Sequence, residues 1–91
     1  MYVVDLDEDS WRTFQRTAPP AVVRAAQQVL AEFLTQHPED RAAAGGRLKK
    51  LKGRVSGLLQ YDLPAFYRLI YRVDQQQQRV TVEYIGKHPN W

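Results

Sequence analysis

Two arginines stand at alternate positions in the stretch Phe66–Val73, where a strand would carry them on one face. Side chains alternate between the faces of a strand. We therefore divide this stretch into an expected core face of Tyr67, Leu69, Tyr71 and Val73, and an opposite face of Phe66, Arg68, Ile70 and Arg72. A guanidinium group can hold a phosphate with two hydrogen bonds. The alternative is that both arginines pair with acids such as Asp74 or Glu83.

A second group of cations precedes this strand, and no acid lies among them: Arg41, Arg47, Lys49, Lys50, Lys52 and Arg54. The first ten residues, by contrast, hold several acids. A basic segment beside an acidic end is typical of proteins that bind a polyanion. Closely spaced lysines also repel one another, which favours one of them as a base near neutral pH. The alternative for both features is a solvated, charged surface.

The C-terminal segment Gly86–Trp91 adds a histidine and an indole ring. His88 is suited to proton transfer at neutral pH, and Trp91 could stack on an exposed base. The alternative is an inert tail whose apolar end packs on the sheet. The other histidine, His37, closes a predicted helix and is better explained by contact with the helix dipole.

Other kinds of site have no support in the sequence. There is no cysteine, which excludes disulfides and thiolate metal sites. No phosphate-binding glycine motif, nucleophile motif or metal-ligand spacing occurs, so we expect no cofactor and no metal. Cations, one histidine and one aromatic side chain are sufficient for RNA cleavage by the 2′-hydroxyl group. That reaction needs a base, cations on the phosphate and an acid for the leaving oxygen.

The elements that position these groups follow from hydrophobic periodicity. We predict a short strand at Tyr2–Leu6, a helix that starts near Asp7–Ser10, and a second helix from Pro20 to Gln36, which Pro38 ends. A loop is expected at Asp40–Gly46. Three strands then follow, over Val55–Tyr61, Phe66–Val73 and Arg79–Ile85, with Gln75–Gln78 as the turn between the last two.

This order predicts a single α+β domain over residues 1–91, with an N-terminal strand and two helices packed on one face of an antiparallel sheet of about four strands. The acidic start does not fit a signal peptide, and no apolar run is long enough to span a bilayer. We therefore expect a cytoplasmic protein without a membrane partner.

The second half of the chain resembles the RelE/ParE superfamily. The resemblance rests on Leu51-Lys52-Gly53, Ser56-Gly57-Leu58, the strand Tyr67–Asp74 and the segment Ile85–His88. Members of this superfamily are usually toxins of bacterial type II toxin–antitoxin pairs. RelE-like members cleave mRNA in the ribosomal A site, and ParE-like members inhibit DNA gyrase. The resemblance implies a cognate antitoxin in a hetero-oligomeric complex, with ribosome and mRNA as further partners.

The resemblance also implies roles for individual residues. Arg68 matches an arginine that stabilises the transition state, His88 matches a general acid, and Lys50 and Lys52 match basic catalytic residues. Trp91 matches an aromatic residue that stacks on the substrate. We assign RNA binding to Arg47, Lys49, Arg54, Arg72, Lys87 and Trp91.

The chain departs from the superfamily pattern at one strand end. Gln60-Tyr61-Asp62 stands where many RelE-like toxins have an arginine. The leading hypothesis is a ribosome-dependent mRNA endoribonuclease, which His88 and the lysine cluster favour. The missing arginine favours the alternatives, a ParE-like inhibitor of DNA gyrase or a degenerate member that only binds its antitoxin.

Overall fold

The structure is a computed structural model, and it describes residues 1–53 and 57–87. Within these ranges the elements follow in the order β1 (Val3–Asp5), α1 (Glu8–Thr17), α2 (Pro20–Gln28), η1 (Val29–Phe33), α3 (Leu34–Gln36), β2 (Leu48–Lys50), β3 (Leu59–Asp62), η3 (Pro64–Phe66), β4 (Tyr67–Asp74) and β5 (Arg79–Lys87). The fold is α+β, as predicted. None of the helices in the described ranges is long and apolar enough to cross a membrane.

The sheet differs from the predicted one in strand number and in one direction. It has five strands in the order β1-β5-β4-β3-β2. The pairs β2–β3, β3–β4 and β4–β5 are antiparallel, and β1 runs parallel to β5. No hairpin joins β1 to β5, so the connection does not impose an antiparallel direction. An ion pair between Asp5 and Arg79, 2.6 Å long, links the two strands.

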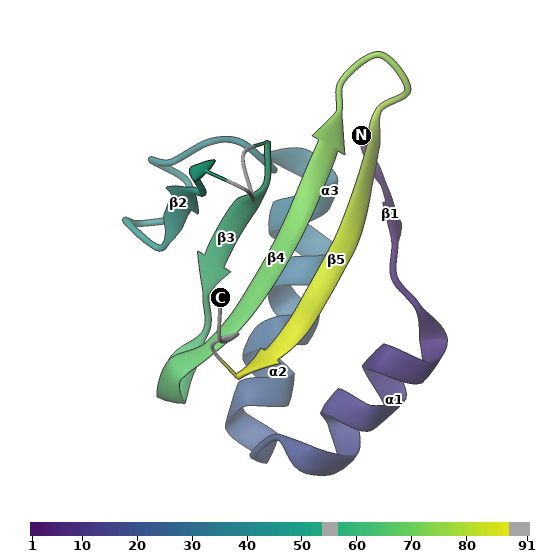
Figure 1. Ribbon diagram of the computed structural model, residues 1–91, viewed down its shortest axis with the longest axis vertical. Helices are drawn as coiled ribbons and strands as arrows, with labels where there is room; N and C mark the ends of the chain where they lie inside the picture. Colours follow the sequence, from purple (N-terminus) through teal and green to yellow (C-terminus); the bar gives the residue numbers. More distant parts are fainter. Residues whose placement is uncertain (54–56, 88–91) are drawn as a thin grey trace.

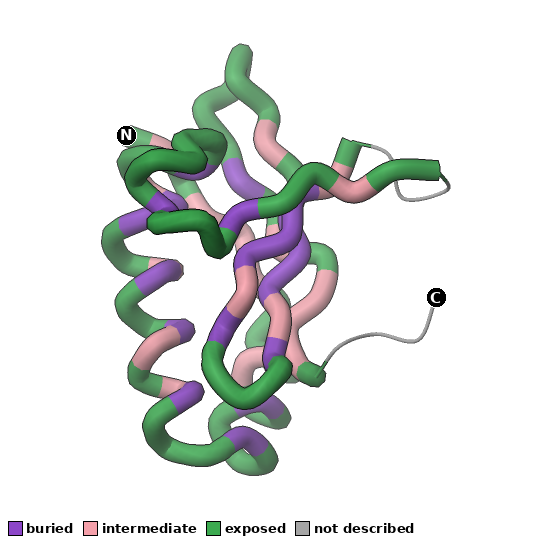
Figure 2. Tube along the Cα trace, turned by 90° about the vertical axis from the view of Figure 1, so that its left-hand side faces the viewer, coloured by how far each residue is buried: buried purple, intermediate pink, exposed green. Residues whose placement is uncertain are grey.

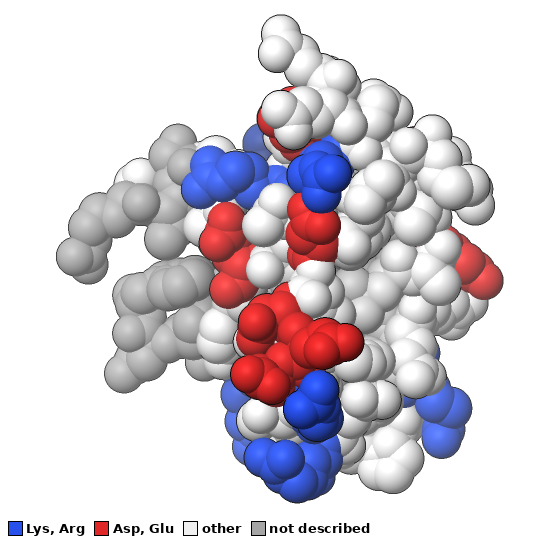
Figure 3. Space-filling model, turned by 90° about the vertical axis from the view of Figure 1, so that its right-hand side faces the viewer, with Lys and Arg blue, Asp and Glu red and all other residues white. Residues whose placement is uncertain are grey.

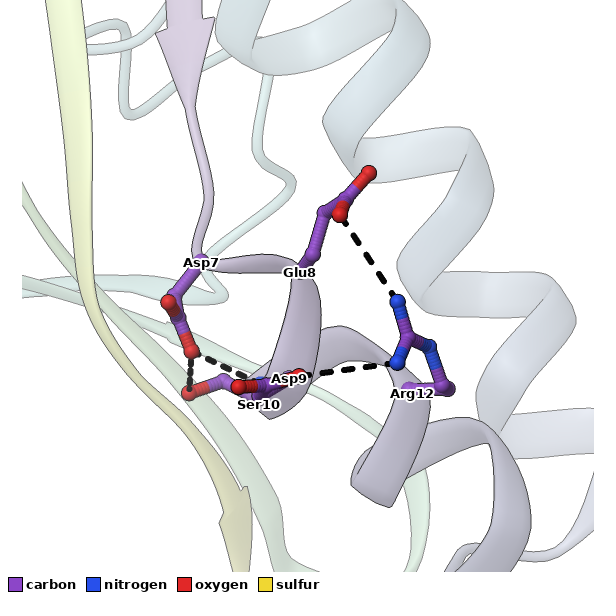
Figure 4. Close-up of polar contacts among 5 residues, drawn as sticks. All are labelled: Asp7, Glu8, Asp9, Ser10 and Arg12. Atoms are coloured by element: carbon purple, nitrogen blue, oxygen red, sulfur yellow. Dashed lines mark hydrogen bonds and ion pairs between the residues drawn. The ribbon is translucent and has the colours of Figure 1, made fainter.

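The start of α1 follows the predicted capping pattern (Figure 4). The side chain of Asp7 accepts a hydrogen bond from the backbone N–H of Ser10 at 2.9 Å, and another from the Ser10 hydroxyl at 3.0 Å. Arg12 lies 3.7 Å from Glu8 and 3.5 Å from Asp9. Acids in the first turn also suit the positive end of the helix dipole. The local sequence therefore determines where α1 begins.

The predicted helix over Pro20–Gln36 is confirmed as one continuous run, α2–η1–α3, with Pro20 in its first turn. Its middle part, η1, is wound more widely than an α-helix. The helix buries one apolar face, made of Val22, Ala26, Val29, Phe33 and Leu34. Figure 2 shows these buried positions on the side of the helix that meets the sheet. The loop at Asp40–Gly46 and the turn at Gln75–Gln78 are confirmed as well.

Tyr71 links the helical layer to the sheet through a buried hydrogen bond. Its side chain is fully buried on β4, and its hydroxyl donates a hydrogen bond to the carbonyl of Pro38, just after α3. Burial, with the nearby charge of Glu39, raises the pKa of Tyr71, so the hydroxyl keeps its proton. Leu69, also on β4, and Val80 on β5 are fully buried in the same core.

Two predicted strands have different bounds. β3 begins at Leu59, so residues 57 and 58 do not belong to it, and the predicted start at Val55 lies outside the described residues. β4 begins at Tyr67, so Phe66 does not belong to that strand. Phe66 lies in the η3 turn, where it and Ala65 adopt positive φ angles, and 80% of its surface is exposed. Ile70 is buried instead of lying on an exposed polar face. Its partners on the neighbouring strands are Gln60 and Tyr84.

Candidate functional site

One face of the sheet is left open by the described helices. In Figure 1, α2 and α3 lie behind the sheet, and the strands face the viewer. Residues that pair across neighbouring strands project to the same face. The register pairs Lys49 with Gln60, and Asp62 with Arg68. Because Gln60 and Asp62 are two positions apart on β3, all four side chains share the open face.

Asp62 is the centre of this group. Its Oδ2 lies 3.2 Å from Nζ of Lys49, and its Oδ1 lies 3.2 Å from Nε of Arg68. The amide of Gln60 donates a hydrogen bond of 2.9 Å to Oδ1. We call these four residues the Asp62 cluster. It brings together side chains from three neighbouring strands.

The Asp62 carboxyl group is ionised at neutral pH. Partial burial opposes the charged form, but hydrogen bonds from Gln60 and Lys49 and the charges of Arg68 and Lys49 outweigh that effect. The pKa of Asp62 is therefore lowered from its ordinary value. The cluster contains two cations and one anion, which leaves one net positive charge.

Arg68 is the most enclosed cation of the cluster, with 14% of its side chain exposed. Its Nη1 donates to the carbonyl of Tyr67 at 3.0 Å. Its Nε is buried and makes no hydrogen bond, although it lies close to Asp62. The Asp62 contact is thus electrostatic, without the aligned, two-pronged geometry that guanidinium groups form with carboxylates and phosphates.

Both arginines of β4 have acidic partners, as the alternative interpretation of this strand expected. Arg72 lies 3.7 Å from Glu83 on β5. Arg68 pairs with Asp62 instead of Asp74 or Glu83. The Arg72 side chain is about half exposed, so solvent weakens its ion pair.

The lysines after Arg47 do not lie together on one face. Lys49 contacts the Asp62 cluster, but Lys50 pairs in register with Leu59, a core residue, and therefore projects to the opposite face. The resemblance implied that Lys50 and Arg68 act together, but the register places them on opposite faces of the sheet. The reason is that Leu48–Lys50 forms the edge strand β2, which the sequence analysis did not predict. Lys52 follows β2 and is exposed.

Two further cations predicted to bind RNA lie away from the cluster. Nη1 of Arg47 donates to the carbonyl of Ala44 at 3.4 Å, and Arg47 lines a groove between the α2–η1 helix and β3. Nζ of Lys87 lies 5.9 Å from the ring centre of Tyr67, a core residue on the helical side. Arg54, His88 and Trp91 lie outside the described residues, so their roles stay predictions.

Asp62 and Gln60 are the members of the cluster to which the sequence analysis gave no role. The sequence does indicate the face on which these two residues lie, because Leu59, Tyr61 and Leu63 alternate with Gln60 and Asp62. An apolar set facing the core places the two polar residues on the face of Arg68. The sequence analysis treats the stretch Gln60–Asp62 only as the place of a missing arginine.

Acidic side chains gather on a different side of the molecule. Figure 3 shows the side that carries β1 and α1, where a group of red side chains stands out. The acids of these elements and of the link between them are Asp5, Asp7, Glu8 and Asp9. Basic side chains lie among these acids in Figure 3, because Arg12 pairs with Glu8 and Asp9 and Arg79 pairs with Asp5.

Comparisons with known proteins bear on the fold. No protein-family model matches the sequence, and no curated protein sequence matches it either. Solved structures do match over almost the whole chain. The isolated RelE toxin of E. coli shares 26% identity with a TM-score of 0.70, and the match covers 100% of this chain and 88% of the toxin.

Two further structures are similar. The YoeB/ParE toxin from Agrobacterium tumefaciens shares 25% identity with a TM-score of 0.74, covering 98% of this chain and 100% of that one. A chain of the RelBE2 toxin–antitoxin complex from Mycobacterium tuberculosis shares 21% identity with a TM-score of 0.71, covering 96% and 98%. The two helices on a five-stranded sheet are those of a RelE-like fold. The chain belongs to the RelE/ParE superfamily.

Proposed function

We propose that this protein is the toxin of a type II toxin–antitoxin pair and that it cleaves mRNA on the ribosome. The observation that carries the proposal is the convergence of Lys49 and Arg68, from strands β2 and β4, on the open face of the sheet. Two cations from separate strands can hold one phosphate between them. The likeness to the RelE toxin of E. coli, at 26% identity, supports the same activity class.

The proposed reaction is attack by the 2′-hydroxyl group on the adjacent phosphate. Arg68 and Lys49 neutralise the charge that develops on the phosphate oxygens. Lys52, exposed after β2, takes the proton of the 2′-hydroxyl. His88 returns a proton to the leaving 5′-oxygen. Arg72 binds a neighbouring phosphate once RNA displaces its partly exposed contact with Glu83.

The proposed inhibitor is a cognate antitoxin with an acidic segment that covers these cations. Several of the similar structures are toxin–antitoxin complexes, including RelBE of E. coli and YoeB-YefM of Staphylococcus aureus. An acidic segment that folds on binding would occupy the positions that RNA phosphates need. The ribosome and mRNA place the proposed activity in the cytoplasm.

A ParE-like gyrase inhibitor is the second candidate. The observation in its favour is that Asp62 neutralises part of the positive charge that a nuclease needs around Arg68. An inhibitor that binds a protein surface does not require a free phosphate site. The degenerate, antitoxin-binding alternative rests on the same observation.

Brief induction of the protein in bacteria separates these candidates. Primer extension on an abundant mRNA should reveal new ends inside the translated region within minutes, and plasmid supercoiling should stay unchanged. Intact mRNA together with loss of supercoiling would favour the gyrase inhibitor. Intact mRNA with normal supercoiling and normal growth would favour the antitoxin-binding alternative.

A further inference from the structure

Asp62 occupies the position between two cations where the proposed function requires a phosphate. It bonds to Gln60 and forms ion pairs with Lys49 and Arg68. Only about a quarter of its side chain is exposed. A carboxylate with these neighbours neutralises one of two positive charges before any RNA arrives. RNA phosphate and the Asp62 carboxylate would therefore compete for the same donors.

The geometry at Arg68 is suited to such a competition. The Nε–H group is buried and makes no hydrogen bond, even though Oδ1 of Asp62 lies 3.2 Å from Nε. A buried donor without an aligned acceptor is costly. An RNA phosphodiester presents two non-bridging oxygens on a mobile chain, and both can align with the guanidinium edge, whereas Asp62 is held to the backbone of β3. The resting contact is thus weaker than the one a mobile phosphate can form.

The contact with Lys49 is likewise easy to exchange. The Lys49 side chain is 59% exposed, and its ammonium group can follow a new anion without losing a buried position. Gln60, by contrast, is almost completely buried, and its amide holds Asp62 from within the sheet. The cluster therefore combines a fixed carboxylate with one enclosed cation and one movable cation.

We propose that Asp62 is an internal counter-ion that competes with substrate phosphate for Arg68 and Lys49 and so weakens RNA binding by this site. The inference rests on the proposed function, since it names the residue that sets the affinity of the same phosphate site. Asp62 positions the two cations and touches no reacting atom. It is a positioning residue, and neutralising its carboxylate strengthens the binding of RNA phosphate.

Asp62→Asn tests the proposal because it removes the charge while keeping the size of the side chain. The probes are inorganic phosphate, followed by the chemical shifts of the Arg68 and Lys49 side chains, and a single-stranded RNA with 2′-deoxy sugars, which resists cleavage. One like charge removed within about 4 Å of the bound phosphate should tighten both affinities by roughly tenfold. Asp62→Glu, which restores the charge, should bind as weakly as the wild type.

The control is Asp74→Asn, which makes the same change in net charge at an exposed end of β4. It should leave the phosphate affinity within about twofold of wild type, because exposed charges farther away are screened. Adding Arg68→Ala to Asp62→Asn should remove the gain. Unchanged or weaker phosphate binding in a folded Asp62→Asn variant would overturn the proposal.

Parallel cleavage assays on ribosomes keep this inference apart from the proposed function. If the Asp62→Asn variant binds phosphate more tightly but neither it nor the wild type cuts mRNA, the counter-ion role holds and the nuclease assignment fails. If the wild type cuts mRNA and the variant shows no gain in phosphate affinity, the nuclease assignment holds and the counter-ion role fails. A gain in phosphate affinity no larger than that of Asp74→Asn would also contradict the counter-ion role, since the change in net charge alone would explain such a gain.

Discussion

Nε of Arg68 lies 3.2 Å from Oδ1 of Asp62, and yet its N–H group makes no hydrogen bond. The strand register places the two residues directly opposite each other on β4 and β3. The contact joins Arg68, on which the proposed chemistry depends, to a carboxylate of the stretch Gln60–Asp62, where the resemblance leads us to expect an arginine.

Arg68→Ala should lower mRNA cleavage by roughly a hundredfold to a thousandfold, the usual cost of losing one preorganised transition-state donor. Arg68→Lys should recover little, because an ammonium group cannot reproduce the flat, forked guanidinium. Cleavage rates on purified ribosomes measure both effects. Arg79→Ala, which removes an exposed arginine paired with Asp5, is the control. Wild-type rates for Arg68→Lys would mean that Arg68 is only a surface cation.

Lys49→Ala and Lys50→Ala form a matched pair that tests the register of β2. Lys49 contacts Asp62 on the open face, and Lys50 pairs with Leu59 on the other. Both variants lose one exposed lysine, so their effects on net charge are equal. We expect Lys49→Ala to weaken the binding of uncleavable RNA by roughly fivefold to tenfold. Lys50→Ala should cause a smaller loss of RNA affinity. A larger effect for Lys50→Ala would support the role that the resemblance implied for it.

Tyr71→Phe should destabilise the protein by about 1–2 kcal/mol, because it leaves the carbonyl of Pro38 without its buried donor. The midpoint and slope of urea unfolding give this free energy. Tyr84→Phe removes a hydroxyl that donates to Lys87 at an exposed site, and it should cost less. Equal costs for the two variants would show that the Tyr71 contact does not hold the helical layer to the sheet.

Acid should weaken the contribution of Asp62 to stability. Its pKa in the folded protein lies below the ordinary value of 3.8, so its stabilising effect is complete above that value and is lost as the pH falls through the folded value. The difference in unfolding free energy between wild type and Asp62→Asn should therefore shrink between about pH 5 and about pH 2. Urea unfolding across this range provides the measurement. A difference that stays constant with pH would argue against an ionic role.

Much of the fold could be predicted because local signals agree with the final packing. The Asp7 cap, the proline at the start of α2 and the glutamine turn each act within a few residues, and all are confirmed. The parallel pairing of β1 with β5 could not be predicted, because it joins residues at opposite ends of the chain. β2 was missed because its three residues are too short to show alternation.

The site was harder to predict than the fold for a physical reason. Alternation along β4 correctly placed Arg68 away from the helical layer, but it gave no information about its partner across β3. The register decides that Lys49, and not Lys50, contacts Asp62, and a shift of one residue would exchange them. The sequence alone shows Asp62 only as part of a stretch that departs from the family pattern. The structure shows that it forms ion pairs with both Lys49 and Arg68.

The most direct test of the proposed nuclease is cleavage of mRNA by the purified chain on reconstituted bacterial ribosomes with an empty A site. The mRNA carries a label at its 5′ end, and a second mRNA has 2′-deoxy sugars across the A-site codon. We predict a cut within that codon in the first mRNA, none in the second, and none with Arg68→Ala. Intact mRNA with the wild-type protein, or cleavage that persists with the deoxy codon or with Arg68→Ala, would contradict the account.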